Sequence, residues 1–160
     1  MGSLSIAPLS ERPQFVEACA AWAYGEWGCH KKDSSLQKCM NRYIQAAKGD
    51  NTRLPQTWAG TIGEKMAGMI SLTPEDHPER IDLTPWIASF FIHPEFRGKG
   101  FSYAFLDAAE RGGTTMGYKT LYLYTPTAQD LYKKAGWETF EQRFDPTGLH
   151  PHVYLMKKTP

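Results

Sequence analysis

One short stretch constrains this chain most, because it predicts a strand, a glycine turn and a helix in immediate succession. Residues 86–92 are apolar or aromatic apart from one serine and carry no charge, as expected of a strand buried on both faces. Pro94 cannot donate a ladder hydrogen bond, so this strand should end just before it. Gly98 and Gly100 then allow backbone angles closed to other residues. From Phe101 onward the apolar positions have helical spacing.

A helix that begins in a glycine turn suits an anion such as a pyrophosphate. Its first N–H groups have no intrahelical partner and lie at the positive end of the helix dipole, and Arg97 and Lys99 add positive charge. The turn is not a nucleotide P-loop, because Gly100 follows Lys99 where serine or threonine is needed. It is not a dinucleotide fingerprint either, because Tyr103 replaces the third glycine. A plain surface loop remains the alternative interpretation.

Hydrophobic periodicity along the rest of the chain predicts further strands and helices, with serine, glycine and proline near their ends. The predicted strands cover residues 4–8, 56–62, 66–72, 86–92, 119–124, 137–144 and 152–156. The predicted helices begin at Ser10, after residues 33–35, at residue 101 and at residue 126. This order predicts one domain, residues 1–160, with an α/β fold: an α+β mixed sheet flanked by helices.

Composition and charge exclude several classes of protein. The chain is 41% hydrophobic with a net charge of +1, which gives no electrostatic reason to bind nucleic acid or a membrane. No apolar run approaches the ~20 residues of a membrane span, and the N-terminus lacks a signal-peptide pattern. Three cysteines without a Cys-x-x-Cys pair predict reduced thiols in a cytoplasmic protein. We expect a monomer or a homodimer. Cys29, His30 and Cys39 match no common zinc spacing, so we expect no metal.

Two motifs resemble those of one known family. Residues 97–102, Arg-Gly-Lys-Gly-Phe-Ser, resemble the Gln/Arg-x-x-Gly-x-Gly/Ala motif of the GNAT superfamily of N-acetyltransferases, with Ser102 in place of the last small residue. The family's later pattern Asn-x-x-Ala-x-x-x-Tyr-x-x-x-Gly-Phe is similar to residues 125–137. There Thr125 replaces the asparagine and Trp137 the phenylalanine. The predicted element order also resembles the family's fold, and residues 83–88 resemble a bacterial subgroup.

This resemblance implies a GNAT-like fold with the order β-α-α-β-β-β-α-β-α-β-β and an acetyl-CoA-dependent N-acetyltransferase. Such an enzyme transfers an acetyl group to a primary amine of a small molecule or peptide by direct attack on the thioester. The amides around Gly98 and Gly100 would cradle the pyrophosphate, and the strand would hold the pantetheine arm. The implied cofactor-binding residues are Phe90, Ile92, Arg97, Gly98, Lys99, Gly100, Phe101, Ser102 and Thr125.

The resemblance also suggests one catalytic side chain. Tyr132 matches the family's tyrosine beside the cofactor sulfur, where a phenol of pKa ~10 can protonate the leaving thiolate. The alternative is a core aromatic residue on a short helix. Many family members place a basic glutamate on the central strand, but residues 86–92 contain none. A water relay is one replacement, and the candidate bases are Glu26, Glu75, Asp76, His77, Asp82 and His93.

The acceptor site is the least constrained part of the sequence. We expect Glu26, Trp27 and Asp76 at this site, and the acidic residues between 75 and 82 could attract a cationic amine. Tyr24 and Trp58 are further candidates for the groove, although core packing is the favoured role of Trp58. Two other functions stay open: a non-catalytic acyl-CoA-binding or sensing module, and a structural domain that has lost the cofactor.

Overall fold

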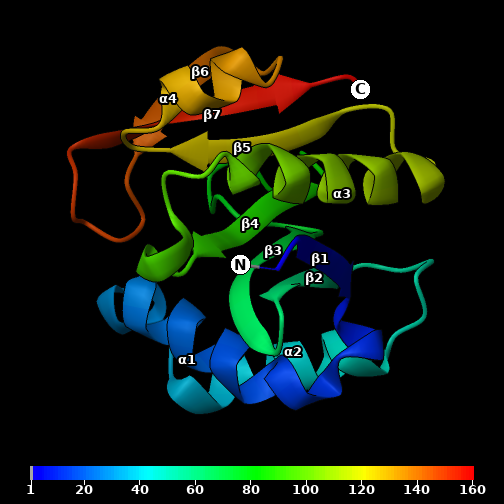
Figure 1. The fold of residues 1–160 in the computed structure, drawn as a ribbon. Coiled ribbons are helices and arrows are strands. Elements are labelled where there is room, and N and C mark those ends of the chain that lie inside the picture. The colour runs from blue at the N-terminus through cyan, green and yellow to red at the C-terminus, as the bar shows by residue number, and fades with distance from the viewer. Residues whose placement is uncertain (1) are drawn as a thin grey trace.

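The computed structural model describes residues 2–160, which form one seven-stranded mixed sheet with helices on both faces (Figure 1). The strand order is β1-β2-β3-β4-β5-β7-β6, and the neighbours are antiparallel except for β4 and β5. The strands are β1 Leu4–Pro8, β2 Gln56–Ile62, β3 Lys65–Thr73, β4 Trp86–Ile92, β5 Leu121–Thr125, β6 Glu138–Phe144 and β7 His152–Lys158. The α-helices are α1 Val16–Glu26, α2 Leu36–Lys48, α3 Phe101–Thr115 and α4 Gln129–Lys134.

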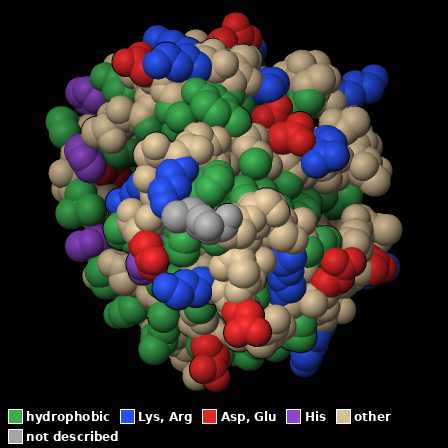
Figure 2. All heavy atoms as spheres, in the orientation of Figure 1, with side chains coloured by type: hydrophobic (Ala, Val, Ile, Leu, Met, Phe, Trp, Pro, Cys, Tyr) green, Lys and Arg blue, Asp and Glu red, His purple; other side chains and the backbone are tan. Residues whose placement is uncertain are grey.

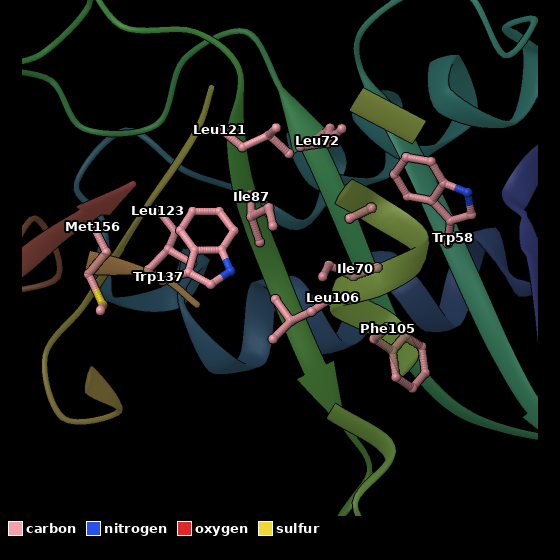
Figure 3. Packing of buried hydrophobic residues seen from close by; sticks show 11 residues of the cluster. Trp58, Ile70, Leu72, Ile87, Phe105, Leu106, Leu121, Leu123, Trp137 and Met156 are labelled. Atoms are coloured by element: carbon pink, nitrogen blue, oxygen red, sulfur yellow. The ribbon is translucent and has the colours of Figure 1, made fainter. Parts of the chain in front are cut away.

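The sheet separates two hydrophobic clusters. Consecutive residues of β2 illustrate this, because Trp58 joins the cluster beneath α3 while Ala59 joins the cluster beneath α1 and α2. This alternation follows from the two-residue period of a strand. Figure 3 shows Trp58, Ile70 and Phe105 between α3 and the sheet. Trp58 lies so close to Gly112 that a Cβ there would meet its ring at 2.3 Å, so Trp58 is a core residue and its alternative place in the acceptor groove is wrong.

The first helix is shorter than the sequence pattern suggests. We expected it to begin at Ser10, but residues Leu9–Glu11 and Pro13–Phe15 form two 3-10 turns and α1 begins at Val16. Pro13 explains the delay, because a proline disfavours the helical conformation of the residue before it, and Arg12 has a φ of −135° and a ψ of 52°. The other predicted elements lie within a few residues of the observed ones. Ser35, for example, caps α2 by accepting a hydrogen bond from the Lys38 N–H at 3.1 Å.

The central strands β4 and β5 separate soon after they meet (Figure 1). Their only paired position within the described chain is Trp86 with Tyr122, and the Tyr122 N–H donates to the Pro85 carbonyl at 3.0 Å. The pairing of β4 with β3 also shifts register opposite Met69–Ser71, and Ser89 there has a φ of 49°. This bulge bends the strand. Together the bulge and the separation leave the backbone edge of β4 open toward β5.

Charged side chains of both signs are interspersed over the visible surface, with no extended patch of one sign (Figure 2). This distribution agrees with the near-neutral composition. The longest helix, α3, has 15 residues, and no helix between residues 2 and 160 is long and apolar enough to cross a membrane.

Candidate active site

Two cavities meet where β4 and β5 separate. The larger has a volume of about 780 Å³ and the smaller about 420 Å³. Glu26, Trp27, Phe90 and Tyr132 line both, so these four residues mark the junction. The larger cavity extends toward α2 and the loops after β3 and β6, whereas the smaller follows β4 toward the start of α3. The arrangement gives two binding spaces that open into one another.

The smaller cavity ends at the glycine turn before α3. Gly98 and Gly100 have φ values of 74° and 78°, a conformation that other residues adopt only with strain. A Cβ at either position would meet no heavy atom within 4 Å, so backbone conformation and not crowding requires these glycines. No side chain of residues 2–160 caps α3 at Gly100. The uncapped N–H groups at the start of α3 suit an anionic group.

The predicted cofactor-binding residues divide into two groups. Phe90, Ile92, Arg97 and Ser102 line the smaller cavity, together with Thr127, Ala128 and Leu131 of the segment leading into α4. Arg97 is fixed there, since its Nε donates to the Ile92 carbonyl at 2.7 Å and its guanidinium lies 5.2 Å from the centre of the Phe91 ring. Its positive charge therefore stays at the end of β4 beside the glycine turn.

The other predicted residues have different surroundings. The Lys99 ammonium lies 5.8 Å from the centre of the Phe96 ring, and Phe101 packs against the core, so neither side chain lines a cavity. Thr125 lines the larger cavity, where its hydroxyl accepts a hydrogen bond from the Ala128 N–H at 3.0 Å. Lys99 and Phe101 can thus offer a ligand their backbone groups, and Thr125 holds the turn before α4.

Tyr132 projects from α4 into the junction of the cavities. Its ring contacts Trp137 edge to face, with centroids 6.4 Å apart. Burial raises the pKa of Tyr132 to about 12, because the charged phenolate is poorly solvated there. The hydroxyl therefore keeps its proton at neutral pH and can donate it.

Asp76 is a candidate base whose pKa is raised by desolvation. Its carboxyl lines the larger cavity, and burial raises its pKa to about 6, against the opposing effect of Lys31 and Arg42. Glu26 and Glu75 line the same cavity. A carboxylate with a pKa close to neutrality combines ionisation at pH 7 with useful basicity, so Asp76 is suited to accept a proton.

The remaining base candidates lie outside both cavities. His77 is fully buried, with Nε2 2.9 Å from the Phe144 carbonyl and Nδ1 accepting from the Glu79 N–H, so it ties the loop to β6. Asp82 forms an ion pair with Arg80 at 2.9 Å. His93 accepts a hydrogen bond from the Glu95 N–H at 3.2 Å. These contacts give all three a structural explanation.

The sequence analysis missed several residues that line the larger cavity. Lys31 and Arg42 come from the segment between α1 and α2 and from α2 itself, and Tyr124 and Asp145 come from the ends of β5 and β6. Nothing in their local patterns distinguishes them from solvated residues. Ser89 had one signal, since it is the single polar side chain of the apolar central strand.

Comparison with known proteins agrees with this geometry. Residues 16–137 match the model of the acetyltransferase (GNAT) family, and the chain therefore belongs to the GNAT acetyltransferases. Members of this family are N-acetyltransferases that use acetyl-CoA. The predicted family and mixed α/β fold are confirmed. Among curated protein sequences, none matches this chain.

Solved structures share the fold at low sequence identity. A GNAT-family acetyltransferase from Streptococcus pneumoniae has a TM-score of 0.70 and 19% identity, covering 98% of this chain and 99% of that one. An aminoglycoside 6′-N-acetyltransferase complexed with coenzyme A has a TM-score of 0.73 and 13% identity, covering 97% and 96%. The spermidine/spermine N-acetyltransferase SpeG from Vibrio cholerae, solved with manganese ions, has a TM-score of 0.69 and 16% identity, covering 98% and 92%.

Proposed function

We propose that this protein is an acetyl-CoA-dependent N-acetyltransferase that acetylates a primary amine of a small molecule or peptide by direct attack on the thioester. The observation that carries the proposal is the meeting of two cavities at Tyr132, beside the unpaired edge of β4. One cavity leads to an uncapped helix N-terminus and the other to a cluster of polar side chains. Two of the similar structures are named for acceptors that are small amines, spermidine and an aminoglycoside.

The smaller cavity fits the donor. The backbone N–H groups from Gly98 to Ser102 would hold the pyrophosphate, with the fixed charge of Arg97 beside them. The open edge of β4 near Phe90 and Ile92 would hold the amide-containing arm, because no neighbouring strand of residues 2–160 pairs with this part of the edge, where Arg97 donates to the Ile92 carbonyl. Bound acetyl-CoA supplies an acetyl group activated as a thioester.

The chain's own groups then serve the transfer. Asp76 accepts the proton of the acceptor amine, which must be neutral to attack. A backbone N–H on the open edge of β4 donates to the oxygen that gains negative charge, and loss of one such donor costs about 3 kcal/mol in comparable sites. Tyr132 gives its proton to the departing sulfur, since burial keeps its hydroxyl protonated.

The test is release of free coenzyme A thiol from acetyl-CoA in the presence of a panel of primary amines. We expect release with at least one amine, at a rate well above hydrolysis without amine, and mass spectrometry should find the acetylated amine. Binding of acetyl-CoA with no turnover for any amine or peptide would contradict the proposal and favour a sensing module. A raised melting temperature with acetyl-CoA separates that outcome from a loss of donor binding.

A further inference from the structure

The wall of the larger cavity carries two cationic side chains, those of Lys31 and Arg42. Lys31 follows the 3-10 turn Gly28–His30, and Arg42 lies in the middle of α2. Neither side chain forms a hydrogen bond or ion pair with any residue in the described range 2–160. Both line the larger cavity, and both lie close enough to the Asp76 carboxyl to oppose the rise of its pKa. They form a pair of positive charges, which we call the Lys31–Arg42 pair.

Two other arginines of the molecule form hydrogen-bonded ion pairs with carboxylates. The Arg80 guanidinium donates to both Glu141 oxygens at 2.8 Å and to Asp82, and Arg143 donates to Glu141 at 2.8 Å. Those groups satisfy one another at the surface. Arg42 forms no such ion pair with a carboxylate of residues 2–160, although a guanidinium offers five donors in a planar fork that matches a carboxylate.

The same cavity also holds carboxylates. Asp76 and Glu75 come from the loop after β3, and Glu26 comes from the end of α1 at the junction with the smaller cavity. Lys31 and Arg42 act on the Asp76 carboxyl electrostatically but form no ion pair with it, so space remains between the charges. A cavity with separated positive and negative groups is complementary to a ligand that carries both charges.

We propose that the acceptor is an amine that also carries a carboxylate, with the carboxylate bound by the Lys31–Arg42 pair and the amine directed to Asp76 and Tyr132. This inference rests on the proposed acetyltransferase function and assigns the acceptor class of the same site. The Lys31–Arg42 pair would give the carboxylate a charge-assisted and, at Arg42, bidentate contact. A phosphate fits less well, because its second negative charge would be repelled by Glu75 and Asp76.

Separation between the two ends of the acceptor is set by the cavity. The amine must reach the junction lined by Tyr132 and Phe90, while the Lys31–Arg42 pair lies in the part that the smaller cavity does not share. A molecule with several atoms between amine and carboxylate therefore suits the cavity better than one with a single carbon between them.

The test compares ω-amino acids, from glycine to 6-aminohexanoate, with the corresponding primary amides, in which the carboxylate has lost its charge. Thiol release gives kcat/KM for each compound. We expect the carboxylate to raise kcat/KM by about ten-fold or more at the best chain length, mainly through KM. Equal values for acid and amide at every length, with amines still acetylated, would overturn the carboxylate site and leave the proposed function standing.

Variants connect this preference to the two residues. In Arg42→Met and Lys31→Met, the ratio of acid to amide kcat/KM should fall toward one, and Arg42→Lys should restore part of it. Lys48→Met on α2 and Lys32→Met, neighbour of Lys31, are matched controls outside both cavities and should keep the ratio. The ratio is used because loss of either cation also changes the surroundings of Asp76.

If no amine is acetylated, binding of 6-aminohexanoate measured by calorimetry tests the carboxylate site separately. Binding of 6-aminohexanoate that Arg42→Met abolishes, with no turnover, would overturn the proposed function and support the carboxylate site. Absence of both turnover and binding would overturn the two proposals together. A preference for the acid that persists in Arg42→Met and Lys31→Met would contradict the assignment to these residues.

Discussion

The two cavities are lined by different kinds of chemical group. The smaller one ends in backbone N–H groups of a glycine turn and a helix N-terminus, and it follows the edge of one strand. The larger one presents side chains from α1, α2, β4, β5 and the loops after β3 and β6. Backbone groups recognise what every member of the family shares, the donor, whereas side chains can vary with the acceptor. Substitutions should therefore affect the two cavities by different routes.

Asp76→Asn should produce the largest effect on activity, because it removes the proposed base from the larger cavity with little change in side-chain shape. We expect kcat/KM to fall by about 10²-fold or more. In the unaltered protein kcat/KM should rise with pH through about 6, as the Asp76 carboxyl ionises, and this limb should be absent from the variant's residual activity.

Asp82→Asn, in the same loop but outside both cavities, serves as the control. It should keep kcat/KM and its rise with pH through about 6. Unchanged kcat/KM in Asp76→Asn would assign the base to Glu26, Glu75 or a water relay instead.

Tyr132→Phe tests the junction that the two cavities share. It should lower kcat by about 10²-fold while changing the Kd of acetyl-CoA little, because the hydroxyl acts on the departing sulfur and not in donor binding. Tyr154→Phe on β7, outside the cavities, should behave like the unaltered protein. Equal turnover in the two variants would remove Tyr132 from the mechanism.

The free energy of unfolding should depend on pH because Asp76 lies in the larger cavity. Because the folded protein raises the pKa of Asp76 from 3.8 to about 6, it binds an extra proton between these pH values, and stability falls as pH rises through that window. Asp76→Asn avoids this penalty. Since one pKa unit corresponds to ~1.4 kcal/mol, a rise from 3.8 to about 6 should make the variant more stable by about 3 kcal/mol above pH 6 and by little below pH 4. Urea unfolding at pH 4 and pH 7 measures the difference, and a gain independent of pH would contradict it.

Gly100→Ala tests the smaller cavity, where the proposed contacts to the donor come from backbone groups. Alanine at a φ of 78° is strained by about 1 kcal/mol and should displace the N–H groups before α3, so the Kd of acetyl-CoA should rise by about ten-fold. Gly117→Ala introduces similar strain at a φ of 93° beyond the other end of α3, also in open space. It should lower stability to a similar extent without changing the Kd. Equal donor affinity in the two variants would contradict the cradle.

Ser102→Ala should have the smallest effect. Ser102 lines the smaller cavity, but the contact that we assign to it is the backbone N–H, which alanine keeps. Calorimetry should show a change of less than about threefold in the Kd of acetyl-CoA. A loss as large as that of Gly100→Ala would mean that side chains build this cavity as well, and the contrast between the two cavities would disappear.

How far the sequence could predict each part follows from this contrast. The strand 86–92, the glycines and α3 are consecutive, so their local pattern suffices to predict a strand, a glycine turn and a helix in succession. The separation of β4 from β5 depends on pairing between distant segments, which no local pattern specifies.

The larger cavity shows the limit most clearly. Lys31, Arg42, Asp76 and Asp145 are far apart in sequence and meet through tertiary packing alone. Asp76 was one of six candidate bases, and its place in the larger cavity, which the sequence did not indicate, distinguishes it from Asp82. The predicted start of the first helix at Ser10 is a smaller failure, because Pro13 follows closely and α1 begins only at Val16.

A crystal structure with coenzyme A bound would test the central claim most directly. We predict that the pyrophosphate accepts hydrogen bonds from the N–H groups between Gly98 and Ser102. The thiol should lie between β4 and β5, within reach of the Tyr132 hydroxyl. Coenzyme A bound elsewhere, or a cradle that stays empty at saturating ligand, would contradict the account.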